Sequence, residues 1–142
     1  MDHDVIRNKP RVYYQTIGKV FSPALNEFVS FSRPGFRHII FRRWRKRSRA
    51  VQKARFALLP LAVKLIGLST THQEFEEMVS SQNIRYWGII AILENKKFKV
   101  IIRRVGENGT LHFWSVIPEW KTSPRRDRKF FKNSGSPTKT PH

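Results

Sequence analysis

Three apolar runs joined by short polar turns fill the second half of the chain, and they constrain the fold more than any other feature. "RYWGIIAIL" (85–93) is apolar at both alternating sets of positions, which is typical of a central strand covered on two faces. "KFKVIIRR" (97–104) alternates between apolar and basic residues. "LHFWSVI" (111–117) follows a turn in which Asn108 and Gly109 suit a positive φ. These runs predict a three-stranded antiparallel meander.

Apolar spacing in the first half predicts a helix from about Pro34 to Trp44. Phe36, Ile40 and Trp44 recur at i, i+4 and i+8, so one stripe can be buried and Trp44 is expected in the core. The opposite side of this helix would carry His38, Arg42 and Arg45.

The sequence also predicts the structure of the segments around this helix. Residues 26–35 predict a short strand that ends at a turn. A second helical run covers residues 50–66, where Pro60 either kinks the helix or begins a separate turn. Residues 70–83 form either a short acidic helix or a loop. Helices followed by strands predict an α+β fold, with two N-terminal helices packed on one face of a curled antiparallel sheet and basic side chains on the other.

Charge narrows the choice of partners. The chain has 28 Lys and Arg against 10 Asp and Glu, a formal charge of +18, and residues 28–73 contain no acid. Such a chain attracts RNA, DNA or an anionic membrane. It has no cysteine, which excludes disulfides, thiolate chemistry and cysteine-ligated metals. It also shows no apolar run of the roughly 18 residues that span a membrane and no signal-peptide pattern, so we predict a cytoplasmic protein.

Length and composition predict one folded domain at residues 20–121. Residues 1–19 are expected to be an N-terminal extension. Residues 122–142 are rich in Pro, Ser, Thr and Lys with little periodic apolar content, so we expect a disordered basic tail that adds nonspecific affinity for nucleic acid.

His38 is the candidate reactive group of the first helix. Arg42 lies one helical turn away and Arg45 two turns away, so a phosphate held by their guanidiniums would lie near the imidazole. An imidazole with an ordinary pKa near 6.5 can transfer protons at neutral pH. A lone histidine is more often structural, and neighbouring cations would lower its pKa whereas bound phosphate would raise it. Proton transfer by a histidine demands no metal. A zinc site is also not expected, because His3, His72 and His142 lack metal-ligand spacing.

The later strands offer further candidates. Either Arg103 or Arg104 would contact phosphate, since alternation lets only one of them face the site. The second acid or base is left open between His112 and Ser115, which alternation places on opposite faces unless a bulge intervenes. Trp114 is a candidate base-stacking platform. The full set of predicted nucleic-acid-binding residues is Arg37, Arg42, Arg43, Arg45, Lys99, Arg104, His112 and Trp114.

The order of these motifs resembles the barnase, EndoU, colicin and RelE-like ribonuclease superfamily, and within it the phage and mobile-element branch of small toxin or effector nucleases. The resemblance covers about residues 20–121 and is carried by "RHI", "ARFALLPLAVKLI", "YWGIIAIL", "FKVIIRRVGENG" and "HFWSVIP". It implies metal-independent RNA cleavage by attack of the 2′-OH. By position, His38 matches the helix histidine, Arg103 or Arg104 the basic strand residue, and Ser115 the hydroxyl of the last strand.

The leading hypothesis from sequence is therefore a small endoribonuclease that needs no cofactor, with His38, Arg103 and Ser115 as catalytic residues. Its partners would be RNA and an acidic antitoxin or immunity protein. The rival hypotheses are a noncatalytic RNA-binding module of the same fold and a basic helix at residues 36–49 that binds an anionic membrane.

Overall fold

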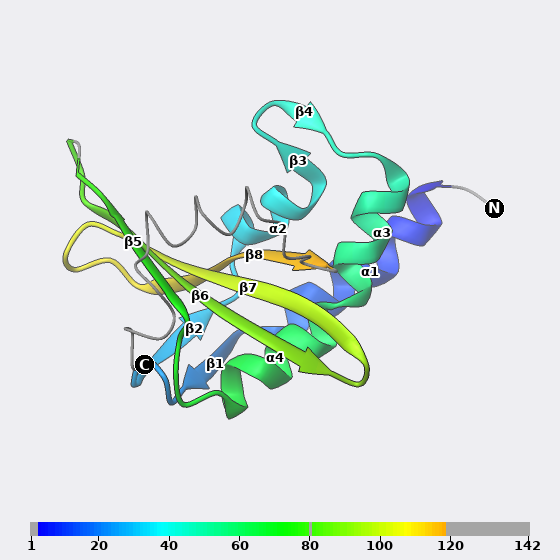
Figure 1. The fold of residues 1–142 in the computed structure, drawn as a ribbon. Coiled ribbons are helices and arrows are strands. Elements are labelled where there is room, and N and C mark those ends of the chain that lie inside the picture. The colour runs from blue at the N-terminus through cyan, green and yellow to red at the C-terminus, as the bar shows by residue number, and fades with distance from the viewer. Residues whose placement is uncertain (1–2, 80, 119–142) are drawn as a thin grey trace, which may run out of the picture.

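A computed structural model describes residues 3–79 and 81–118 and shows a mixed α+β fold built on a mostly antiparallel sheet (Figure 1). The predicted tail at residues 122–142 lies outside the described residues. The described helices are α1 (His3–Ile17), α2 (Arg33–Ile40), α3 (Arg49–Ala57) and α4 (Leu59–Leu68). The described strands are β1 (Lys19–Ser22), β2 (Glu27–Ser30), β3 (Phe41–Arg42), β4 (Arg45–Lys46), β5 (Glu74–Met78), β6 (Ile84–Leu93), β7 (Lys96–Val105) and β8 (Leu111–Pro118).

The main sheet has the strand order β1-β2-β8-β7-β6-β5. The predicted meander is confirmed as β6, β7 and β8, which pair antiparallel with their neighbours. Beyond it, β2 runs parallel to β8, and the chain between these two neighbouring strands contains α2, α3 and α4 as well as strands β3 to β7. In the loop before β8 the positive φ lies at Gly106, not at Asn108 or Gly109 as expected.

The expectation of a helix or loop at residues 70–83 is wrong, because Glu74–Met78 forms the edge strand β5. Phe75 of this strand packs against Trp87, with ring centres 5.5 Å apart. The ion pair between Glu74 and Lys99, 3.2 Å apart, ties the strand to β7. Cross-strand contacts thus outweigh the local sequence pattern, which had favoured a short helix or a loop.

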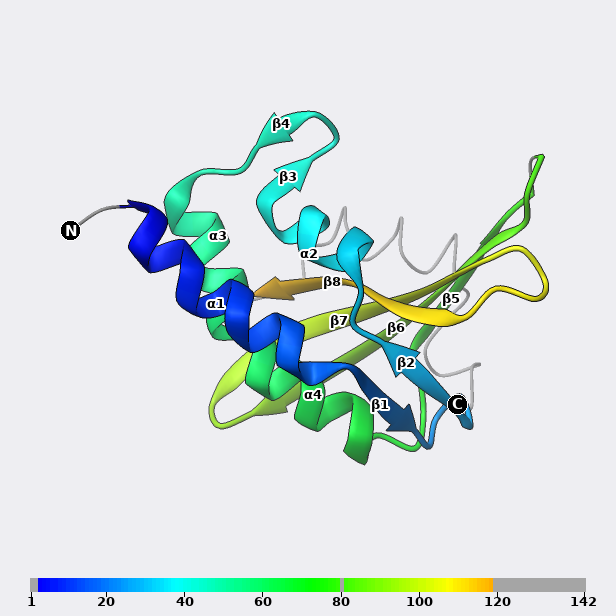
Figure 2. The ribbon, with the colours of Figure 1, turned by 180° about the vertical axis from the view of Figure 1, so that it is seen from behind.

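One face of the sheet holds the core. Phe98, Val100 and Ile102 of β7 are fully buried, as their alternation predicts, and α1 and α4 lie together on one side of the sheet (Figure 2). Tyr14 of α1 is only 3% exposed, and its hydroxyl donates to the carbonyl of Ser32 at 2.6 Å. Residues 1–19, expected to be an extension, therefore supply a helix whose described part packs into the core.

The first predicted helix is shorter than expected: α2 ends at Ile40, and the chain turns into the β3–β4 hairpin. The backbone N–H of Arg47 donates to the carbonyl of Ile40 at 2.7 Å, and its Nε donates to the carbonyl of His38 at 3.0 Å. These bonds satisfy carbonyls that a helix end leaves free. Trp44 is consequently 86% exposed at the hairpin tip, and not in the core.

The second helical run divides at Leu58, and Pro60 lies in the first turn of α4, where its missing N–H costs no helical hydrogen bond. Gln52 and Phe56 face the core from α3, whereas Ala54 is exposed.

Close packing between α2 and β8 depends on Gly35. A Cβ at this position would collide with the backbone carbonyl of Phe113 and lie 2.7 Å from the hydroxyl of Tyr14. We expect Gly35→Ala to destabilise the protein by about 1–3 kcal/mol, since the clash is with backbone and a buried ring. Urea unfolding followed by circular dichroism measures this. Gly67→Ala is the matched control, because a Cβ there meets only ordinary contact at 3.7 Å. Equal stability of the two variants would contradict the close approach.

Candidate functional site

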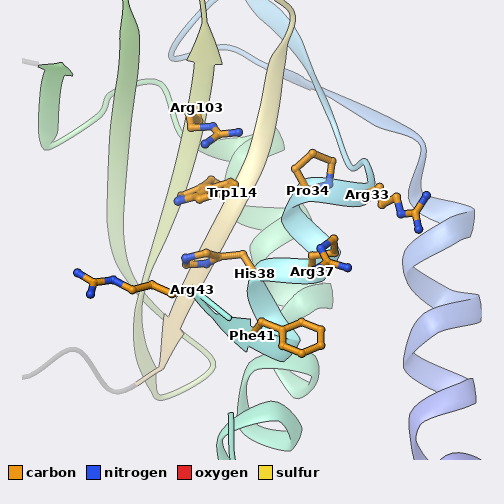
Figure 3. Close-up of a pocket in the computed structure, with 8 residues that line it drawn as sticks. All are labelled: Arg33, Pro34, Arg37, His38, Phe41, Arg43, Arg103 and Trp114. Atoms are coloured by element: carbon orange, nitrogen blue, oxygen red, sulfur yellow. The ribbon is translucent and has the colours of Figure 1, made fainter. Parts of the chain in front are cut away.

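The indole of Trp114 lies between two predicted site residues (Figure 3). The His38 ring on α2 is 4.4 Å from the Trp114 ring, centre to centre, and the guanidinium carbon of Arg103 on β7 is 3.7 Å from the ring centre. A ring contact, with the planes of His38 and Trp114 tilted by 30°, and cation–π attraction hold the three side chains together. The faces of Trp114 are thus engaged by protein, which argues against the expected role as a base-stacking platform.

A β-bulge at Trp114 decides which residues share the site. Ile102 pairs with Phe113 and Ile101 pairs with Ser115, so Trp114 is an extra residue in β8. The bulge changes the alternation. Ser115 turns to the same face as His112, whose partner is Arg103, and Val116 turns to the core beside Val100. The exception that the sequence left open, an intervening bulge, is therefore present, and His112 and Ser115 share a face.

His112 positions Arg103. The Nε of Arg103 donates to Nε2 of His112 at 3.0 Å, so this imidazole nitrogen accepts and is unprotonated. Burial, together with the charge of Arg103, lowers the pKa of His112, and the hydrogen bond that His112 donates to the backbone of Thr110 acts in the opposite direction and raises it. The hydrogen bond and the lowered pKa both favour a neutral His112 that holds the guanidinium of Arg103 in place.

His38 lies among cations. Burial lowers its pKa to about 4, helped in turn by the positive charges of Arg47, Arg55 and Arg103. Its Nδ1 is buried and has no hydrogen-bond partner among the described residues. At pH 7 the imidazole is therefore neutral and able to accept a proton.

Arg55, which was not among the residues predicted from the sequence, extends from α3 toward the same cluster. Its Nη1 donates to Oγ of Ser115 at 2.9 Å, and its buried Nε has no partner within the described part of the chain. Burial, then the charges of Arg47 and Arg42, lowers the pKa of Arg55 to about 10. A signal was present: helical spacing puts Arg55 on the stripe of Gln52 and Phe56, an unusual place for a cation.

Ser115 is 1% exposed and accepts from Arg55, so it is placed to orient that guanidinium and not to reach into solvent.

Arg47 was also not predicted from the sequence, and both its side chain and its backbone are hydrogen-bonded. Its Nε bonds the His38 carbonyl, and its own carbonyl accepts from Nε2 of Gln52 at 2.8 Å. The backbone beneath His38 is thus fastened to the start of α3.

A groove of about 480 Å³ opens beside this cluster. None of the described residues that line it is acidic, so the groove favours an anion. Its lining consists of Arg33, Pro34, Arg37, His38, Phe41, Arg43, Arg103 and Trp114. Of the predicted nucleic-acid-binding residues, Arg37, Arg43 and Trp114 therefore meet here with His38 and Arg103.

Other predicted residues lie elsewhere. Arg42 and Arg45 belong to the β3–β4 hairpin, and not to the helix turns above His38. Lys99 is engaged by Glu74. Arg104 faces away from Arg103, where it pairs with Glu27 and donates to the carbonyl of Gly109 at 2.9 Å. Of the two arginines, Arg103 is therefore the one that faces the site.

The low pKa of His38 makes stability depend on pH. Between about pH 4 and 6.5 the unfolded chain binds a proton that folded His38 does not, so stability decreases as the pH falls through this window and is fully present above it. We expect this histidine to account for a loss of at most about 3 kcal/mol. Urea unfolding of the wild type and His38→Gln at pH 7 and pH 4.5 isolates the effect, because His112 is common to both proteins. If the free energy of unfolding of the two proteins changed equally between pH 7 and pH 4.5, the lowered pKa would be contradicted.

Within the described residues there is no cluster of three or more side chains suited to a metal ion. In the same part of the chain, every helix is too short or too polar to cross a membrane. The fold and site define a class: a basic α+β protein with a neutral histidine in an arginine-lined groove. Comparisons of the chain with protein-family models, curated proteins and solved structures find no match.

Proposed function

We propose that this protein is a small endoribonuclease that cleaves RNA without a metal ion, by attack of the 2′-OH on the adjacent phosphate. The observation that carries the proposal is His38: a neutral imidazole, with a pKa lowered to about 4, on the wall of a groove lined by arginines. A neutral histidine can act as a general base, and guanidiniums stabilise a phosphate that gains negative charge.

The proposed reaction begins when His38 takes the proton of the 2′-OH. The 2′ oxygen then forms a bond to phosphorus, giving a pentacoordinate phosphorane. The bond from phosphorus to the 5′ oxygen breaks, and that oxygen receives a proton for which the new imidazolium is a source. The products are a 2′,3′-cyclic phosphate and a 5′-hydroxyl. Nearby phosphate charge offsets the arginines, so the pKa of His38 rises once RNA is bound.

Two arginines have proposed roles around this step. Arg103 lines the groove and would bind the phosphate, with His112 holding its guanidinium in place. Arg55, one of the cations that act on His38, would stabilise the phosphorane, and Ser115 would orient it. In this scheme Ser115 and His112 are positioning residues.

The same proposal extends to family and partners. A histidine-bearing helix packed against the last strand of an antiparallel meander supports the barnase, EndoU, colicin and RelE-like packing that the motifs resemble. A toxin or phage effector of that kind would be paired with an acidic antitoxin or immunity protein, and an acid-free groove suits such a partner.

The test is incubation of the full-length protein with end-labelled RNA in EDTA, with DNA of the same sequence in parallel. We expect cleavage of the RNA alone, with 2′,3′-cyclic phosphate ends. If RNA is bound and left intact, the proposal fails in favour of a noncatalytic RNA-binding module. If cleavage needs a divalent metal ion, the metal-independent mechanism fails.

A further inference from the structure

The β3–β4 hairpin is not required for the chemistry just described, yet it carries the most exposed aromatic side chain of the described chain. The hairpin pairs Phe41 with Lys46 and Arg42 with Arg45, so Arg43 and Trp44 form its two-residue tip. Trp44 is 86% exposed. The hairpin projects away from the main sheet (Figures 1 and 2), so the sheet and its helices leave the tip open.

Cations surround this tryptophan. A second groove, of about 540 Å³, runs along the hairpin to the start of α3, and none of its described lining residues is acidic. They are Arg42, Arg43, Trp44, Arg45, Lys46, Arg47, Ser48 and Val51. An exposed aromatic face flanked by guanidiniums is the chemistry that binds unpaired nucleic acid, in which bases stack and phosphates meet cations.

The hairpin groove and the groove at His38 have one lining residue in common. Arg43 lines both. The hairpin base is also bonded to the backbone of His38, through Nε of Arg47. A nucleic acid strand whose phosphate lies at His38 would therefore pass along Arg43 toward Trp44.

The tip is also conformationally costly. Arg43 has a φ of +60°, in the left-handed region that a side chain other than Gly, Asn or Asp rarely adopts. Glycine would fit this position without the cost. A strained arginine that lines both basic grooves is consistent with a binding role for its side chain.

We propose that the β3–β4 hairpin selects single-stranded RNA by stacking an unpaired base on Trp44, next to the phosphate held at His38. This inference rests on the proposed function for the choice of RNA and adds the class of RNA. A paired base keeps its faces within the duplex stack, so duplex RNA would gain only the phosphate contacts. An anionic membrane is a poorer match, because the hairpin tip offers one large exposed apolar side chain where a membrane-binding element buries a whole apolar face.

The experiment measures binding and cleavage separately on the full-length chain. Binding is measured by fluorescence anisotropy in EDTA with a 2′-deoxy-substituted single strand, which lacks the attacking hydroxyl, and with its duplex. We expect Trp44→Ala to weaken single-strand binding by about five- to a hundredfold and duplex binding by less than about twofold. Trp44→Phe should restore most of the affinity, since a ring remains. Phe28→Ala is the matched control, because Phe28 is another exposed aromatic residue, on β2.

The outcomes are distinguishable from those of the nuclease test. Equal loss on single strand and duplex, or no loss on either, overturns the hairpin inference whether or not the wild type cleaves RNA. Selective loss with no cleavage by any variant supports the hairpin and overturns the nuclease. Vesicles of phosphatidylcholine and phosphatidylserine are a third arm: Trp44-dependent binding to them at physiological salt, without selective loss on single strands, overturns the inference in favour of a membrane contact.

Discussion

Replacing His38 with alanine is expected to lower the rate of RNA cleavage by about 10²- to 10⁴-fold, the usual contribution of a general base. RNA affinity should change by less than about threefold, because the imidazole is neutral at pH 7 and the surrounding arginines remain. Single-turnover cleavage with excess protein, together with anisotropy on an uncleavable strand, measures both quantities.

A matched control for this variant is His72→Ala, since His72 lies in the segment before β5 and lines neither basic groove. It should cleave as the wild type does. Retention of full activity by His38→Ala would remove His38 from the mechanism. A parallel loss of binding and cleavage would make the histidine a part of the binding surface and not its reactive group.

Replacing Arg55 with methionine is expected to lower the cleavage rate by about 10²- to 10³-fold, as when a charge-stabilising donor is removed from an active site. A second readout separates this role from a structural one. Arg55 is one of the cations that lower the pKa of His38, so the variant should raise that pKa toward its ordinary value. NMR titration of the His38 ring in the absence of RNA detects the change.

Ser115→Ala is the companion variant, because it keeps the charge of Arg55 and removes only the acceptor 2.9 Å from Nη1. We expect a smaller loss of cleavage and little change in the pKa of His38. If Arg55→Met left the cleavage rate intact while the pKa of His38 rose, Arg55 would be a neighbour of the site without a part in the reaction. If the pKa did not move, the proposed proximity itself would be wrong.

The arginines around His38 disfavour its protonated form in the free protein, yet they can assist a reaction at a phosphate. The positive charges of Arg47, Arg55 and Arg103 repel the imidazolium form of His38, so the free protein keeps His38 neutral. A phosphate in the groove would relieve that repulsion and stabilise the imidazolium that forms during proton transfer. Substrate binding and proton transfer would then be coupled through one electrostatic field.

Much of the sheet was predictable because its signals are local. Alternation over "KFKVIIRR" correctly put Phe98, Val100 and Ile102 on the buried face, since side chains in a strand point to opposite faces in turn. The edge strand Glu74–Met78 was not predictable in the same way. Its acidic residues are typical of a helix start or a loop, and they form a strand only because they pair with β6.

The periodicity of apolar residues could not predict the β3–β4 hairpin or the bulge in β8. Phe36, Ile40 and Trp44 match a helical stripe, yet Arg47 bonds the carbonyls of His38 and Ile40 and ends the helix before Trp44. Such a bond joins residues that a pattern search treats separately. Likewise, one extra residue at Trp114 reverses the alternation of β8, and nothing in the order of apolar and polar residues marks it.

The sequence by itself determined the α+β class, the antiparallel meander and the strongly basic surface, because periodicity and charge are properties of neighbouring residues. It also singled out His38. Only the tertiary structure decided that Arg55 and Arg47 join His38, that Arg103 and not Arg104 does so, and that Trp44 lies in solvent. Those outcomes depend on hydrogen bonds and packing between segments far apart in the chain, such as Arg55 with Ser115, which local patterns do not encode.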